Sequence, residues 1–212
     1  MVPNCSFGKT KVQQRRIVKE LLLIVFLTGT AIADEVVLVD GVAADGYTLM
    51  VGDKNQWDTV VYSDPISSAS GYIAVEPDAA AGAINATWNG KGEAQLFLAY
   101  NEFQDFSSLL EQDSALVMLL QVTTPPKRKV VIKMGCEYPC AANANISDLL
   151  KALPPEQWLR VSIALRCFAD GGLDIEHVDT PLLLLTRGKL ALSVADVRIV
   201  PGIAESATIR CE

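Results

Sequence analysis

The sequence predicts an all-β protein, a β-sandwich or jelly roll that carries one or two short helices. Short strand-like segments recur along the chain, and clusters of Gly, Pro, Asn and Asp separate them. In one of these segments every second residue is apolar: Leu159, Val161, Ile163 and Leu165. A period of two belongs to an antiparallel strand with one buried face. Many short strands with turn residues between them are typical of sandwiches and jelly rolls.

The strand pattern covers most of the chain after residue 46. The expected strands are residues 47–51, 57–63, 71–75, 84–88, 94–99, 115–123, 129–134, 158–165, 182–186 and 189–200. Residues 182–185 are all leucine, which predicts a central strand covered on both faces. In the last segment the apolar period slips by one residue after Val194, as it does at a β-bulge.

Two short segments have a helical pattern. The first is residues 107–112. The second is residues 146–153, which follow Asn145, carry leucines on one face and end before Pro154. Proline directly after a periodic segment is a usual sign that a helix ends there. After the strand at 158–165, Cys167 and Phe168 are expected to form a corner.

The first 33 residues have the layout of a secretory signal peptide. A basic stretch (residues 9–19) precedes an apolar stretch (residues 21–27), and Ala31-Ile32-Ala33 is a small-x-small cleavage site. The alternative is a membrane anchor, but the apolar run breaks at Thr28, short of the roughly 20 residues that span a bilayer. We therefore expect residues 34–212 to form one periplasmic or extracellular domain, without stable membrane insertion after cleavage.

The charge of the expected mature domain excludes some partners. Residues 34–212 hold 13 of the 18 Lys and Arg residues and 24 of the 25 Asp and Glu residues, a formal net charge of −11. Such a domain is not expected to bind nucleic acid or anionic lipid by electrostatic attraction. It is compatible with neutral ligands such as glycans, and it has carboxylates to spare for a hard cation.

The cysteine pattern agrees with export. Cys5 lies in the expected leader, which leaves Cys136, Cys140, Cys167 and Cys211. An even number of cysteines in an oxidising compartment favours disulfides. A bridge between Cys136 and Cys140 would close a tight loop, and Cys167 with Cys211 is the complement, although four cysteines allow three connectivities. A zinc or redox site is the alternative, but no histidine lies near the Cys136 pair.

No motif indicates catalysis. His177 is the only histidine and has no nucleophile motif near it, so we interpret it as a surface residue rather than a member of a triad. No spacing singles out a carboxylate pair for glycoside hydrolysis. The Gly-rich pieces, residues 90–92 and 171–172, are interpreted as turns.

Aromatic residues are the better indication of function. Sugar rings stack on Trp and Tyr faces while polar neighbours bind their hydroxyls. Trp57 has polar neighbours on both sides and is predicted to be an exposed platform, with Asn55 and Gln56 beside it as ligand-binding residues. Tyr138, at the tip of the expected cysteine loop, is the second candidate. The other tryptophans, at positions 88 and 158, are interpreted as packing residues.

Asp196 is a candidate metal ligand. Together with acids near the expected mature N-terminus, such as Asp34, Glu35 or Asp40, it would form a structural calcium site. The alternative, an ion pair with Arg198, is favoured because no dense run of acidic ligands is present. No other cofactor is expected.

Several pieces of the chain are similar to one family. They are residues 49–57, 86–91 and 134–140, and a longer run from Trp158 through residues 165–169 and 178–181 to 196–198. In this order they resemble the C-terminal galactose-binding-like domain of ExoP-type exo-β-glucanases, secreted bacterial enzymes of glycoside hydrolase family 3. The resemblance implies a galactose-binding-like jelly roll, related to carbohydrate-binding modules, in a secreted bacterial protein.

The resemblance does not extend to the catalytic parts of those enzymes. There the domain follows two catalytic domains, whereas here the expected signal peptide leads directly into the accessory domain. We therefore expect a non-catalytic module that recognises a β-glucan or related polysaccharide. The alternatives are a protein-interaction or structural domain for a separately encoded hydrolase, and a small glycosidase with its own carboxylate pair.

Overall fold

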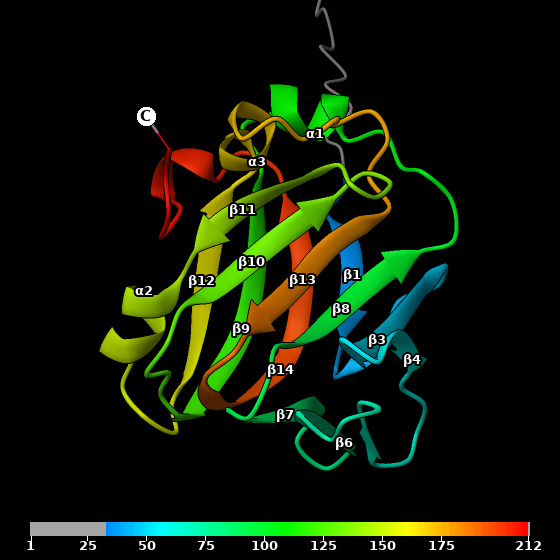
Figure 1. The fold of residues 1–212 in the computed structure, drawn as a ribbon. Coiled ribbons are helices and arrows are strands. Elements are labelled where there is room, and N and C mark those ends of the chain that lie inside the picture. Colours follow the sequence, from blue (N-terminus) through cyan, green and yellow to red (C-terminus); the bar gives the residue numbers. More distant parts are fainter. Residues whose placement is uncertain (1–32, 212) are drawn as a thin grey trace, which may run out of the picture. The chain divides into compact units, whose positions relative to one another are not determined.

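The computed structural model of the chain describes residues 33–211. These residues form two antiparallel sheets packed face to face, with short helices at the margins (Figure 1). The predicted all-β sandwich is therefore confirmed. Apart from Ala33, the predicted signal peptide (residues 1–33) lies outside the described residues, and its cleavage stays a prediction.

The front sheet, which lies nearer the viewer in Figure 1, has the strand order β11-β10-β13-β8-β3-β4. Its strands are β3 (Tyr47–Asp53), β4 (Gln56–Val60), β8 (Ala94–Tyr100), β10 (Val130–Gly135), β11 (Ala141–Asn145) and β13 (Thr180–Thr186). All neighbouring strands are antiparallel.

The back sheet has the order β12-β9-β14-β7-β6-β5, and β1 pairs with both β14 and β2. Its strands are β1 (Glu35–Val39), β2 (Val42–Ala43), β5 (Ile66–Ser67), β6 (Ile73–Asp78), β7 (Ala83–Asn89), β9 (Ala115–Thr124), β12 (Trp158–Ala164) and β14 (Lys189–Val200). The predicted bulge in β14 is confirmed, since Val194 pairs with Leu120 and Asp196 with Leu119, which leaves Ala195 as the extra residue.

The hydrophobic core fills the space between the sheets. On β13, Leu182 and Leu184 point into this core and are buried, whereas Leu183 and Leu185 point to the opposite face and stay half-buried. The leucine run is thus a central strand, as predicted. The expectation that both faces of this strand are covered is wrong, because the outer face of β13 is open. This open apolar strip is part of a groove on the outer face of the front sheet.

The helices differ from the expectation at one place. α1 (Ser107–Glu111) and α2 (Ser147–Ala152) match the two predicted segments, but residues expected to form a corner are a third short helix, α3 (Arg166–Asp170). Leu165 and Phe168, three positions apart, are both fully buried, so one side of this turn faces the core. Within residues 33–211, no helix is long and apolar enough to span a membrane.

Four strands were not expected from the sequence: β1, β2, β5 and β11. β1, β2 and β5 are short. β11 consists of alanine and asparagine alone, with Ala142 and Ala144 buried. Both residue types are poor strand formers, so its two-residue period carried little hydrophobic signal.

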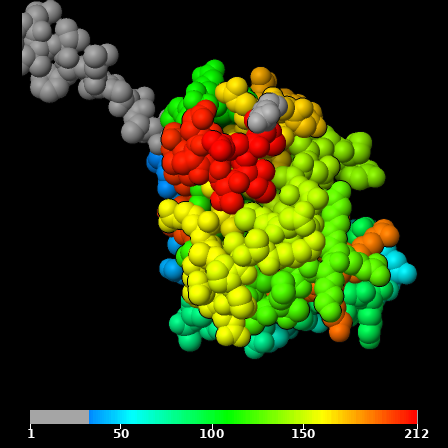
Figure 2. All heavy atoms as spheres, turned by 90° about the vertical axis from the view of Figure 1, so that its left-hand side faces the viewer, coloured from blue at the N-terminus to red at the C-terminus, as the bar shows by residue number. Residues whose placement is uncertain are grey.

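Both expected disulfides are present, Cys136–Cys140 and Cys167–Cys211. The second ties the C-terminal segment to α3. This segment, red in Figure 2, lies beside β12 at the free edge of the back sheet. There the Ile209 N–H donates to the Ser162 carbonyl at 2.9 Å. Covering an edge strand in this way removes backbone groups that would otherwise be open to pairing with another chain.

Candidate functional site

A groove lies on the outer face of the front sheet, the face turned away from the core. Its floor includes Gln95 of β8, Leu183 and Leu185 of β13, and Lys133 of β10. Trp57 of β4 lines it toward one edge of the sheet, and the loop that follows β10 lines it toward the other. The groove has a volume of about 670 Å³.

The strand register explains why these floor residues share one face. Gln95 lies opposite Leu185, which lies opposite Val131, so the three form a row across the strands. In the next row, two residues further along each strand, Leu183 lies opposite Lys133. Residues two apart in a strand point to the same side, so both rows face outward.

Trp57 is brought into the groove by a β-bulge. Val51 pairs with Thr59 and Asp53 pairs with Gln56, so β4 has one residue more than β3 in this interval. The Trp57 backbone crosses directly over Gly52. A Cβ atom at position 52 would lie 2.0 Å from the Trp57 carbonyl oxygen. Extra residues of this kind re-aim a side chain, and 43% of the surface of Trp57 remains exposed.

A second contact fixes the same backbone. The side-chain amide of Gln95 donates to the Trp57 carbonyl oxygen at 3.1 Å. Gln95 stands on β8 beyond β3, so it reaches across the glycine to the bulged strand. The Trp57 platform is therefore held by a residue that is itself part of the groove floor.

A buried carboxylate, that of Asp53 at the end of β3, stabilises the β3–β4 hairpin. Asp53 is fully buried and accepts hydrogen bonds from the Asn55 N–H at 2.9 Å and from the N–H and hydroxyl of Ser70 at 2.6 and 3.0 Å. Burial by itself would raise the pKa of this carboxyl, but hydrogen bonds from Ser68, Asn55 and Ser70 outweigh it and lower the pKa to about 2. Asp53 thus joins the hairpin to the loop between β5 and β6 of the other sheet.

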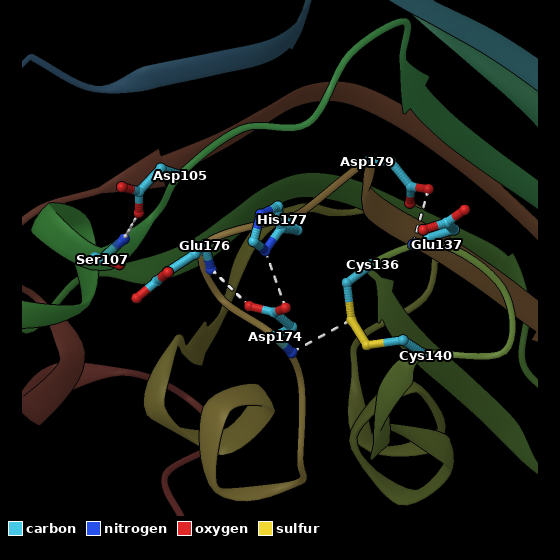
Figure 3. Close-up of polar contacts among 9 residues, drawn as sticks. All are labelled: Asp105, Ser107, Cys136, Glu137, Cys140, Asp174, Glu176, His177 and Asp179. Carbon is cyan, nitrogen blue, oxygen red and sulfur yellow. Dashed lines mark hydrogen bonds and ion pairs between the residues drawn. A yellow bond between two sulfur atoms is a disulfide. The ribbon is translucent and has the colours of Figure 1, made fainter.

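Tyr138 belongs to the loop between Cys136 and Cys140. A disulfide between these two cysteines closes the loop (Figure 3). Inside the loop, the Cys140 N–H donates to the Glu137 carbonyl at 2.8 Å. From outside, the Asp179 carboxylate accepts the Glu137 N–H at 3.0 Å, and the Asp174 N–H donates to the Cys136 sulfur at 3.3 Å. Tyr138 itself is 97% exposed at the tip of the loop.

The structure brings two of the four predicted ligand-binding residues together. Trp57 and Tyr138 line the same groove, although they come from distant parts of the chain. Asn55 and Gln56 do not line it. The Asn55 side chain donates to the Ser70 hydroxyl at 2.7 Å, so it belongs to the Asp53 network rather than to the groove.

Sequence reasoning missed the groove floor. Gln95, Lys133 and Glu93 carry no motif, and they become neighbours only through strand pairing. The sequence did hold one indication of the floor, at Leu183 and Leu185. Apolar residues on the outer face of a strand indicate either a covering layer or a binding surface, and here they form the apolar floor of the groove.

The remaining tryptophans lie outside the groove. Trp88 is buried, and its indole N–H donates to the Ala94 carbonyl at 3.0 Å. Trp158 stands at the start of β12 in the back sheet and is 38% exposed. Their predicted roles in core and rim packing agree with these positions.

Asp196 is engaged by Arg198. The Arg198 Nε donates to the two carboxylate oxygens at 2.7 and 2.9 Å, and Nη2 donates to one of them at 2.8 Å. The hydrogen bond with Asp196 raises the pKa of Arg198, and the nearby charges of Asp34 and Asp40 act in the same direction. Between residues 33 and 211 no group of three or more His, Cys, Asp or Glu side chains is arranged to hold a metal ion.

His177 lies on the surface and pairs with Asp174, with Nδ1 2.9 Å from the carboxylate (Figure 3). The Asp174 carboxylate also accepts the Glu176 N–H at 3.2 Å. The Phe103 ring packs edge-on against the imidazole. These are contacts of an ordered surface loop, and they agree with the prediction of a surface histidine.

A family model described as galactose-binding domain-like, Exop_C, matches residues 46–199. The matched range is well over half of the chain and contains the groove with both aromatic residues. The chain belongs to the Exop_C family. The resemblance seen in the sequence motifs is thereby confirmed. No curated protein matched the chain in a sequence search.

Solved structures show the same fold as this Exop_C chain. The extra C-terminal domain (X) of the exo-1,3/1,4-β-glucanase ExoP from a Pseudoalteromonas species has a TM-score of 0.63 at 16% identity, over 79% of this chain and 92% of that domain. Against the whole ExoP enzyme the TM-score is 0.64 at 15% identity, over 82% of this chain but only 21% of the enzyme.

A family 30 carbohydrate-binding module from a cellulosomal cellulase of Clostridium thermocellum is also similar. Its TM-score is 0.55 at 13% identity, over 80% of this chain and 98% of the module. At these identities the similarities establish the galactose-binding-like sandwich.

Proposed function

We propose that the chain is a secreted, non-catalytic carbohydrate-binding module that holds a β-glucan or related polysaccharide in the groove of the front sheet. The observation that carries this proposal is the placement of Trp57 and Tyr138 along one groove with an apolar floor between them. Pyranose rings have apolar faces and polar edges. Aromatic side chains pack against the faces, and polar groups around them take up the hydroxyls.

The dimensions of the groove suit a chain of sugars rather than one ring. From β4 to β10 the sheet order crosses β3, β8 and β13, which makes four inter-strand steps. At about 4.8 Å per step, Trp57 and the strand that leads to Tyr138 are roughly 19 Å apart across the sheet. The polar groups along this path are Gln95, Glu93 and Lys133.

The relatives support the same function. The family match and the ExoP domain connect the fold to an exo-1,3/1,4-β-glucanase, and the family 30 module is named as carbohydrate-binding. The two disulfides support a periplasmic or extracellular location, because such bridges persist in oxidising compartments.

Isothermal titration calorimetry with soluble β-1,3- and β-1,4-glucans tests the proposal. The wild-type chain is expected to bind at least one of them, and Trp57→Ala is expected to weaken binding about three- to tenfold, as loss of an aromatic contact does. Trp158→Ala is the matched control, since this tryptophan is similarly exposed but lies on the back sheet. The proposal would be contradicted if the wild-type chain bound neither glucan, or if both variants lost the same amount of affinity.

A further inference from the structure

The groove continues into a second hollow that is rich in positive charge. This basic hollow, with a volume of about 530 Å³, is lined by Glu93, Arg128, Lys129, Val131, Lys133, Asn143, Leu185, Thr186 and Arg187. It shares Glu93, Lys133 and Leu185 with the aromatic part of the groove. The two hollows therefore form one continuous surface over β8, β13 and β10.

Four of the 13 positive charges in residues 34–212 line this hollow. The acids that line the aromatic part but not the hollow, Glu137 and Asp179, lie toward the Tyr138 loop, at the other end of β10. Charge is thus separated along the groove. Although the domain is acidic overall, screening over about 8 Å at physiological salt makes the local cations decisive for a bound group.

The hollow is a built feature of the fold rather than a set of independent surface side chains. Its cations come from the loop before β10, from β10 itself and from the turn after β13, and Thr186 joins the loop to the turn. The buried Thr186 hydroxyl donates to the Lys129 carbonyl at 2.9 Å and accepts the Gly188 N–H at 2.9 Å. Gly188 lets this turn lie against Arg128, whose Cβ would be 2.9 Å from a Cβ at position 188.

Most of these cations have no acidic partner in the fold. Arg187 pairs with Glu93, with Nε 2.8 Å from the carboxylate. Within residues 33–211, Arg128, Lys129 and Lys133 form no ion pair. Lys133 is moreover half-buried, between Leu183 and Asn143 on the neighbouring strands. The stem of such a lysine lies along the apolar sheet face while its ammonium group stays open to solvent, and so to an anionic group of a ligand.

We propose that the basic hollow recognises carboxylate or sulfate groups on an anionic polysaccharide whose sugar rings lie along the aromatic part of the groove. Arg128 offers a planar donor fork that matches either oxyanion, and Lys129 and Lys133 add point charges beside it. This inference rests on the proposed function, because the sugar rings are placed by Trp57 and Tyr138. It adds the chemical class of the ligand.

Three forms of one glucan test it: a neutral β-1,3-glucan, the same glucan carboxymethylated, and the same glucan sulfated. Calorimetry at low salt is expected to give about fivefold to tenfold tighter binding for at least one anionic form, as two or three exposed ion pairs would provide. The difference is expected to shrink at high salt. The anionic form that gains more identifies the preferred group.

A charge-matched pair of variants locates the effect. The double variant Arg128→Gln/Lys129→Gln is expected to lose most of the gain with the anionic forms and to keep binding to the neutral glucan. The control is Lys151→Gln/Arg160→Gln, which removes the same charge from α2 and from β12 of the back sheet. It is expected to keep the gain.

The possible outcomes separate the two proposals. If the neutral and anionic forms bind equally, or if both double variants lose the gain alike, the basic hollow has no specific role while the neutral-glucan site stands. If the anionic forms bind as well to Trp57→Ala as to wild type, the attraction does not involve the groove and the inference fails. If no form of this glucan binds and the β-1,4-glucan does not bind either, the proposed function itself fails.

Discussion

The two ends of the groove present an aromatic side chain in different ways. Trp57 lies on a bulged strand. Its backbone packs against Gly52, which has no side chain to obstruct it, and the buried Asp53 carboxylate stabilises the same hairpin. Tyr138 stands on a loop closed by the Cys136–Cys140 disulfide. One end therefore depends on a buried ionised group and the other on a covalent bond. Acid should therefore weaken the Trp57 end of the groove, and a reductant should weaken the Tyr138 end.

The largest effect is expected from Asp53→Ala. Removing the carboxylate leaves the Asn55 N–H and the N–H and hydroxyl of Ser70 without their acceptor, so unfolding should become easier by about 3–5 kcal/mol. Urea denaturation measures this change. Asp58→Ala, an exposed acid on the same hairpin, is the control and should stay within about 0.5 kcal/mol of wild type. Similar losses in the two variants would show that Asp53 is not a special support.

Acid should remove the same support gradually. The pKa of Asp53 is lowered to about 2 from 3.8, so its ionised form stabilises the folded state fully above about pH 4. That contribution is lost as the pH falls through about 2. The difference in unfolding free energy between wild type and Asp53→Asn should therefore be constant from pH 7 to about pH 4 and shrink toward pH 2. A difference that already changes between pH 7 and pH 5 would rule out Asp53 as its source.

Gly52→Ala tests the Trp57 end without removing a polar group. A Cβ at position 52 would meet the Trp57 carbonyl oxygen and carbon at 2.0 and 2.3 Å, and these backbone atoms have to move. We expect a loss of up to about 3 kcal/mol in stability, the upper end of the range for overpacking. We also expect glucan affinity to fall as far as it does in Trp57→Ala. Unchanged glucan binding would mean that the bulge does not place the platform.

Local patterns allowed much of the fold, but only part of the site, to be predicted. Most strands of both sheets followed from two-residue periods, and Trp57 and Tyr138 were recognised as exposed from polar neighbours and from the cysteine loop. The groove floor required the register between β8, β13 and β10, which pair across long stretches of chain. No local pattern specifies that register.

The covering of both faces of β13 was predicted wrongly, and the ligand-binding roles of Asn55 and Gln56 stay predictions. Leu183 and Leu185 were expected under a covering layer, because an apolar run does not distinguish a packed face from an open binding face. Asn55 and Gln56 were expected in the site because they adjoin Trp57. Neither residue lines the groove, and the Asn55 side chain donates to the Ser70 hydroxyl.

The smallest effect on stability is expected at the Tyr138 end. Replacing the Cys136–Cys140 bridge by serines releases a loop with a sequence separation of only 4, so the entropic cost is about 2 kcal/mol, below that of the longer Cys167–Cys211 closure. Glucan affinity should fall to that of Tyr138→Ala, because the loop no longer holds the ring over the groove. Denaturation and calorimetry on the same variant separate these effects. Full glucan affinity without the bridge would show that hydrogen bonds which do not involve the sulfur atoms, such as that from the Glu137 N–H to the Asp179 carboxylate, suffice to hold the loop. The contrast between the two ends would then be one of degree.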